Sequence, residues 1–79
     1  MYFVYVLQSL RYPDRYYVGL TNDMAKRLET HNAGASNYTA KDRPWKLIVS
    51  VSFEKLYKAD AFEKYLKSGS GRAFCKRHF

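Results

Sequence analysis

The sequence predicts an α+β domain in which a small, mainly antiparallel three-stranded sheet is flanked by helices. Strand-like runs of β-branched and aromatic residues occur at about residues 3–7, 16–20 and 47–53. Segments with helical spacing of apolar residues follow the second and third of these runs. At 79 residues the chain has room for one compact unit with a modest core. We therefore expect a single domain over residues 1–79.

The first two predicted strands form a hairpin. Residues 3–7 are apolar on both faces, which is typical of a strand that is covered on two sides. Turn-forming residues follow, so residues 16–20 are expected to return antiparallel to the first strand. This pairing brings Tyr5, Arg15 and Tyr17 near one another.

A helix is predicted after the hairpin. Thr21 or Asn22 is expected to cap its N-terminus, and Gly34 is well placed to end it. Arg27 and His31 are four residues apart, so they share one face of this helix.

The segment after this helix, residues 33–44, has no clear periodicity and is rich in Gly, Ser, Asn, Lys and Arg. We expect an exposed loop that contributes to a nucleic-acid surface. Residues 47–53 then alternate apolar and polar side chains, which predicts a strand with one face in the core. Near the end of the sequence, Ser70 is expected to cap a last short helix that carries several basic residues.

A second long helix is predicted over residues 56–68, with Gly69 as its stop. Its apolar stripe runs through Ala59, Phe62 and Leu66, and Glu63 lies at the edge of that stripe. A carboxylate in this position is costly unless it is paired, reaches solvent or binds a cation. Glu63 is therefore the most suspicious acid in the chain.

The formal charge of +7 and the pI of about 9.7 favour a polyanionic partner, with a merely soluble basic protein as the alternative. After Glu63 there are five Lys or Arg residues and no acid. The single cysteine, Cys75, excludes an intramolecular disulfide and a cysteine-based metal cluster. No apolar stretch approaches the length needed to span a membrane. We expect a cytoplasmic protein with no membrane association.

Several short motifs together resemble the GIY-YIG nuclease superfamily, in particular its short stand-alone members. These motifs are Phe3-Val4-Tyr5, Tyr17-Val18-Gly19, the pair Arg27 and His31, Pro44-Trp45-Lys46-Leu47, and Glu63. Phe3 stands where the name-giving motif has Gly, and Val replaces Ile in both tripeptides. The resemblance implies a GIY-YIG-like fold and a metal-dependent endonuclease that hydrolyses phosphodiester bonds in DNA, with repair or recombination as its expected setting.

The resemblance also implies roles for individual residues. Glu63 would hold Mg²⁺ or Mn²⁺, and Arg27 would stabilise the transition state. One of the two motif tyrosines, Tyr5 or Tyr17, would activate or position water, and His31 would orient water or accept a proton. The alternatives are a Glu63 paired with a neighbouring lysine, a solvated Arg27, two core tyrosines, and a histidine that favours a helix C-terminus.

DNA is the expected partner, with RNA as an alternative and a protein partner as a further one. Six basic residues are candidates for nucleic-acid contacts: Arg15, Lys26, Lys41, Arg43, Lys67 and Arg72. Two other functions stay open, a catalytically weak nucleic-acid-binding module and an interaction subunit of a larger repair assembly. Metal-dependent cleavage distinguishes the nuclease from both alternatives. Salt-sensitive binding of nucleic acid distinguishes the binding module from the interaction subunit.

Overall fold

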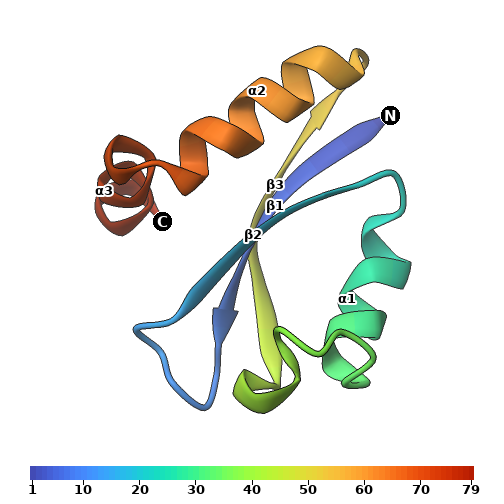
Figure 1. Cartoon of the computed structure of the whole chain (residues 1–79), viewed down its shortest axis with the longest axis vertical. Helices are drawn as coiled ribbons and strands as arrows, with labels where there is room; N and C mark the ends of the chain where they lie inside the picture. The colour runs from blue at the N-terminus through green and yellow to red at the C-terminus, as the bar shows by residue number, and fades with distance from the viewer.

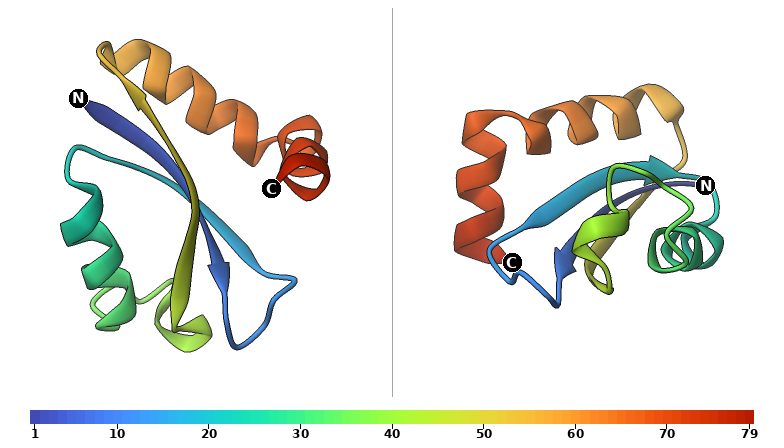
Figure 2. Two further views of the ribbon diagram at one scale, coloured as in Figure 1. Left: turned by 180° about the vertical axis from the view of Figure 1, so that it is seen from behind. Right: turned by 60° about the horizontal axis from the view of Figure 1, so that its bottom comes forward.

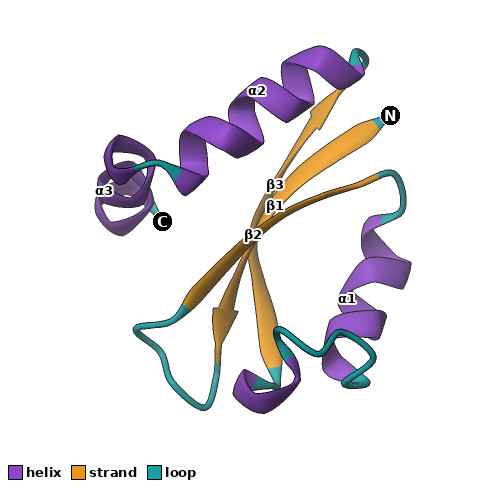
Figure 3. Cartoon of the chain, viewed as in Figure 1, coloured by secondary structure: helices purple, strands orange, loops and turns teal.

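The computed structural model describes residues 1–79 and confirms the predicted α+β architecture (Figures 1 and 3). Three helices and a short 3-10 helix accompany the three strands. The elements in chain order are β1 (Tyr2–Ser9), β2 (Tyr16–Thr21), α1 (Met24–Asn32), the 3-10 helix Ala40–Asp42, β3 (Trp45–Phe53), α2 (Leu56–Lys67) and α3 (Gly69–His78). None of the helices is both long enough and apolar enough to cross a membrane.

The sheet has the strand order β2-β1-β3, and both pairings are antiparallel. Its central strand, β1, is buried on both faces from Val4 to Leu7, as the apolar run predicts. Tyr5 lies opposite Gly19 of β2 and Ser50 of β3. The outer strand β2 has a neighbour on one side only, which leaves its other edge free for a site.

The helices cover the two faces of the sheet separately (Figure 2). On one face α2 and α3 pack over the side chains of β1 at Val4 and Val6. On the other face α1 packs over Tyr5 and Leu7. Alternate residues of β1 therefore belong to two different clusters, because successive side chains of a strand point to opposite faces.

The N-terminus of α1 differs from the prediction. The cap is Asp23, not Thr21 or Asn22, because the Asp23 carboxylate accepts a hydrogen bond from the Lys26 backbone N–H at 3.1 Å. The Thr21 hydroxyl instead accepts from the Asp23 N–H, so it shapes the turn before the helix. At the other end Gly34 has a φ of 78° and follows the C-cap, as predicted.

The C-terminal helices also meet differently from the prediction. Ser68, not Ser70, caps α3, since its hydroxyl accepts from the Gly71 N–H. Gly69 is therefore the first residue of α3 and not a stop after α2. One extended residue thus separates the two helices.

The segment 33–44 is also less exposed than predicted. Thr39 and Asp42 are buried, and the 3-10 helix gives the segment local structure. The Asn32 side chain exchanges two hydrogen bonds with the Trp45 backbone, and the Trp45 indole N–H donates to the Thr39 carbonyl. These bonds hold the segment against the face of the sheet that carries Tyr5.

Candidate active site at the edge of the sheet

Tyr5 and Gly19, the last residues of the two motif tripeptides, lie opposite each other on neighbouring strands, and the Tyr5 ring lies over Gly19. A Cβ at Gly19 would overlap the Tyr5 hydroxyl and its Cζ atom, so only glycine leaves room for this ring. The group that approaches Gly19 most closely is thus the tyrosine of the neighbouring strand.

The Tyr5 hydroxyl stays protonated at neutral pH. Burial raises the pKa of Tyr5 far above its ordinary value, and the nearby Tyr17 and Glu63 raise it further against the opposing charge of Arg27. The ring is only 1% exposed. Tyr5 therefore serves as a neutral hydrogen-bonding group in the interior.

His31 connects Tyr5 to the segment between α1 and β3. Its Nε2 lies 2.9 Å from the Tyr5 hydroxyl, and its Nδ1 lies 2.8 Å from the Thr39 hydroxyl. Burial lowers the pKa of His31, and the positive charge of Arg27 lowers it further, so the imidazole is neutral. Both ring nitrogens are occupied and the residue is buried. This geometry suits a positioning group better than the water-activating role expected from the sequence.

Thr39 belongs to the same hydrogen-bonded cluster as Tyr5 and His31, although no sequence pattern predicts it. It is 1% exposed, and its hydroxyl is the partner of the His31 Nδ1. Its segment has no periodicity, so no pattern in the sequence places this hydroxyl beside the helix that carries His31.

Tyr17 is the motif tyrosine that is open to solvent. Its ring centroid lies 5.0 Å from that of His31 and 6.3 Å from that of Tyr5. Its hydroxyl makes no hydrogen bond within the chain. Every buried side-chain oxygen and nitrogen does have a partner, so the Tyr17 hydroxyl is not buried. The Tyr17 oxygen is therefore accessible to water or substrate, in contrast to that of Tyr5.

Arg27 and Glu63 approach the tyrosines from two different helices. The Arg27 side chain is exposed on α1 and takes part in none of the three ion pairs of the chain. Glu63 on α2 is largely buried, with its side chain 17% exposed and its Oε2 3.2 Å from the Lys67 Nζ. The charges of both residues act on the pKa of Tyr5. Arg27 shares α1 with His31, and Lys67, the partner of Glu63, lines the groove that also contains Tyr17.

Glu63 is the one carboxylate that this cluster offers to a cation. No group of three or more His, Cys, Asp or Glu side chains in the structure could hold a metal ion. Mg²⁺ is commonly bound by one or two carboxylates, with water and substrate phosphates completing its shell. The cluster fits that pattern. Without a metal ion, the ammonium group of Lys67 is the cation that pairs with the Glu63 carboxylate.

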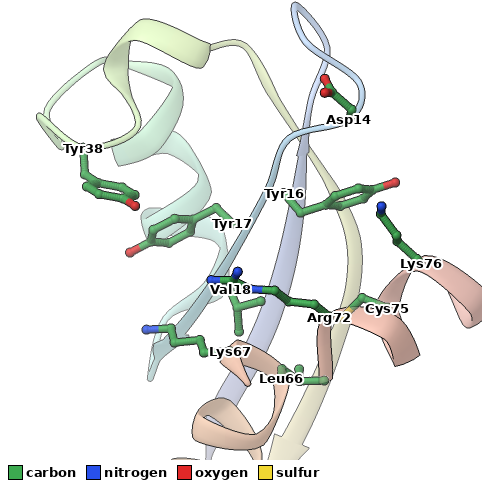
Figure 4. A pocket seen from close by; sticks show the side chains of 10 residues that line it. All are labelled: Asp14, Tyr16, Tyr17, Val18, Tyr38, Leu66, Lys67, Arg72, Cys75 and Lys76. Atoms are coloured by element: carbon green, nitrogen blue, oxygen red, sulfur yellow. The ribbon is translucent and has the colours of Figure 1, made fainter. Parts of the chain in front are cut away.

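The predicted nucleic-acid residues line several depressions of the surface. Lys67 and Arg72 line a groove of about 570 Å³ along β2, beside Tyr17 (Figure 4). Lys26 shares a smaller depression with Arg27. Lys41 lines a separate cavity near the 3-10 helix.

Two of the predicted nucleic-acid residues are engaged within the chain. The Arg15 guanidinium lies 2.7 Å from the Asp42 carboxylate and stacks 4.5 Å from the Tyr12 ring centroid. The Arg43 guanidinium lies against Gly34, at the end of α1. The ion pair of Arg15 joins the loop before β2 to the 3-10 helix. A role in nucleic-acid contacts stays a prediction for all six residues.

Residues 1–77 match the family model described as the GIY-YIG catalytic domain. The chain belongs to the GIY-YIG family. It is similar to the UPF0213 protein YsiG of Lactococcus lactis subsp. lactis (strain IL1403), with 40% identity over 67 residues, which cover 84% of this chain and 62% of YsiG. It is also similar to the UPF0213 protein YazA of Bacillus subtilis (strain 168), with 39% identity over 84% of this chain and 66% of YazA.

A third relative is the structure-specific endonuclease subunit SLX1 of Candida dubliniensis (strain CD36), with 38% identity over 98% of this chain and 28% of SLX1. The chain thus spans less than two thirds of the length of each of these relatives. Membership of the GIY-YIG family confirms the resemblance drawn from the sequence motifs.

In this GIY-YIG domain, Gly19→Ala is expected to lower the free energy of unfolding by about 1–3 kcal/mol, because the new methyl group overlaps the Tyr5 ring. Urea unfolding measures the loss. Gly69→Ala is the matched control, since a Cβ there meets no atom within 4 Å. An unchanged unfolding midpoint for Gly19→Ala would show that the Tyr5 ring does not occupy this place.

Stability of the GIY-YIG domain is expected to fall as the pH drops below about 6.5, the ordinary pKa of histidine. Burial lowers the pKa of His31, so below pH 6.5 the unfolded chain binds more protons than the folded one. The His31 contribution is complete above that pH and is lost as the pH falls through the lower pKa of the folded state. Urea unfolding between pH 7.5 and 5 measures the free energy of unfolding of the wild type and of His31→Gln.

The control is His78→Gln, which changes an exposed histidine at the end of α3. This variant is expected to keep the loss of stability at low pH, and His31→Gln is expected to reduce it. Identical pH profiles for the wild type and His31→Gln would contradict the neutral, buried state of His31.

Proposed function

We propose that this chain is a divalent-metal-dependent endonuclease that hydrolyses phosphodiester bonds in DNA, in repair or recombination. One observation carries the proposal: the solvent-open Tyr17 packs against His31 of α1, the helix that also carries Arg27, and it shares a groove with Lys67, the ion-pair partner of Glu63. Phosphodiester hydrolysis needs a positioned water, a donor for the phosphate oxygens and compensation of developing charge. Tyr17 would position the water, Arg27 would donate to the phosphate oxygens, and a divalent cation held by Glu63 would compensate the developing charge. The family membership and the printed name of the SLX1 relative support the same reaction.

Tyr17 acts on the attacking water in this proposal. Its hydroxyl has no partner in the protein, so it can hydrogen-bond a water molecule at the edge of the sheet. A hydroxyl group in this position can orient the water for attack on the phosphate. Tyr5 and His31 fix the position of the Tyr17 ring from the interior, since both rings pack against it.

Arg27 and Glu63 act on the phosphate in this proposal. The planar Arg27 guanidinium donates to phosphate oxygens, whose charge increases in the transition state. Glu63 would hold Mg²⁺ or Mn²⁺ together with water and a phosphate oxygen. When bound there, the ion supplies charge compensation at the phosphate and lowers the pKa of its bound water. A bound cation would compete with Lys67 for the Glu63 carboxylate, and the Lys67 ammonium would then be able to contact the nucleic acid.

The test is incubation of the purified protein with single-stranded, duplex, flapped and branched DNA, and with RNA, in Mg²⁺, in Mn²⁺ and in chelator. The expected result is cleavage of DNA that requires a divalent ion. The printed name of the SLX1 relative, a structure-specific endonuclease subunit, motivates the flapped and branched substrates. Binding without cleavage across the whole panel would favour the alternative of a nucleic-acid-binding module.

A further inference from the structure

The groove beside Tyr17 has an aromatic wall of tyrosines and a basic wall of Lys and Arg side chains. Along the aromatic wall Tyr17 and Tyr38 lie together, whereas Tyr16 points the opposite way, toward Lys76 (Figure 4). The aromatic side chains, Tyr16, Tyr17 and Tyr38, come from β2 and from the segment before the 3-10 helix. The basic side chains, Lys67, Arg72 and Lys76, come from the end of α2 and from α3. Residues far apart in the sequence thus build a single groove against the free edge of β2.

The aromatic wall presents rings that the fold does not bury. Tyr38 is 79% exposed and Tyr16 is 38% exposed. The Tyr38 ring centroid lies 6.1 Å from that of Tyr17, so the exposed ring adjoins the proposed active site. The Tyr38 side chain makes no hydrogen bond within the chain. A solvent-exposed ring of this kind offers a face on which a nucleobase can stack.

Two of the three basic side chains of the wall have no acidic partner. Arg72 and Lys76 take part in none of the ion pairs of the chain, and Lys67 pairs with Glu63 alone. One acid, Asp14, lines the groove against three cations. The wall therefore has a net positive charge and suits a chain of phosphates.

We infer that this groove binds an unpaired segment of nucleic acid, with its phosphates on Lys67, Arg72 and Lys76 and its bases on Tyr38 and Tyr16. The inference rests on the proposed function, because the bound strand would leave the active site at Tyr17. The groove of about 570 Å³ lies within the size range of pockets for small organic ligands, about 300–1,000 Å³, so it suits one or two nucleotides. Bases paired in a duplex already stack on each other and cannot stack on these tyrosines.

The test is equilibrium binding of fluorescent oligonucleotides in chelator, measured by anisotropy, so that no cleavage occurs. The probes are a thymidine oligonucleotide, a uridine oligonucleotide, a DNA duplex of the same length, and an abasic strand that keeps the phosphates. Both single strands are expected to bind more tightly than the abasic strand. Tyr38→Leu is expected to weaken single-strand binding about five- to hundredfold, as loss of a stacking contact typically does.

Two control variants separate the groove from the general surface. Tyr57→Leu removes a tyrosine that is 69% exposed at the start of α2, away from the groove, and is expected to leave binding unchanged. Arg72→Gln is expected to weaken binding of every probe, whereas Arg77→Gln, on the same helix but outside the groove, is expected to weaken it less. The abasic strand is expected to bind wild type and Tyr38→Leu equally, because it has no base to stack.

Equal loss of abasic and thymidine binding in Tyr38→Leu, or equal effects of Tyr38→Leu and Tyr57→Leu, would overturn the inference. If the protein cleaves DNA in a metal-dependent way but gives either of these results, the proposed nuclease activity stands and the groove is not its strand-binding site. Tyrosine-dependent binding of single strands without any cleavage would support the groove and refute the nuclease.

Discussion

Glu63→Gln is expected to abolish cleavage of DNA while leaving folding and nucleic-acid binding nearly intact. The amide keeps the shape of the side chain but lacks the charge that attracts a hard cation. Loss of the ion pair with Lys67, one helical turn away, costs only about 0.3–0.5 kcal/mol of stability. Single-turnover cleavage over a range of Mg²⁺ concentrations measures the effect, and urea unfolding verifies the fold.

Asp60→Asn is the matched control for Glu63→Gln. Asp60 lies on the same helix and forms the equivalent i,i+4 ion pair, with its Oδ2 2.9 Å from the Lys64 Nζ. Its side chain is 45% exposed, in contrast to the largely buried Glu63. Asp60→Asn is expected to cleave at the wild-type rate. Normal cleavage by Glu63→Gln at limiting Mg²⁺ would exclude Glu63 from the active site.

Arg27→Lys is expected to slow single-turnover cleavage by about 10²–10³, the typical cost of losing a preorganised donor to a developing charge. Lysine keeps the positive charge but lacks the planar fork that can meet two phosphate oxygens. Equilibrium binding of DNA is therefore expected to change little. The comparison of cleavage with binding distinguishes an interaction made in the transition state from a simple electrostatic contact.

Arg77→Lys serves as the control for Arg27→Lys, because Arg77 is an exposed arginine at the end of α3. It is expected to leave both cleavage and binding unchanged. If Arg27→Lys weakens binding as much as cleavage, or cleaves like the wild type, Arg27 acts only as an electrostatic contact.

Periodicity in the sequence predicts the elements of this fold well, and their ends less well. The apolar run of β1 and the alternation in β3 lead to the correct three-stranded sheet. The cap of α1 is different because Thr21 and Asp23 can both accept a backbone N–H, and the backbone path decides which residue takes the helical N–H. The cap of α3 is Ser68 and not Ser70, because the helix begins at Gly69 and the Ser68 hydroxyl accepts from the Gly71 N–H.

The candidate site is predictable where it depends on strand pairing. The hairpin brings Tyr5 and Tyr17 together because side chains on one face of paired strands are neighbours. The bond between His31 and Thr39 is not predictable in this way, because hydrogen bonds of Asn32 and Trp45 set the position of the Thr39 segment. The groove likewise depends on how α3 turns back toward β2, which no local pattern encodes.

Single-turnover cleavage by Tyr17→Phe tests most directly whether this cluster is a nuclease active site. The Tyr17 hydroxyl makes no bond within the chain, so its removal is expected to leave stability and DNA binding unchanged and to cut cleavage by about 10² or more. Tyr5→Phe is the comparison, since it breaks the bond to His31 and is expected to destabilise the fold by about 1–3 kcal/mol. Wild-type cleavage by Tyr17→Phe, or no cleavage by the wild type in Mg²⁺ or Mn²⁺, would contradict this assignment.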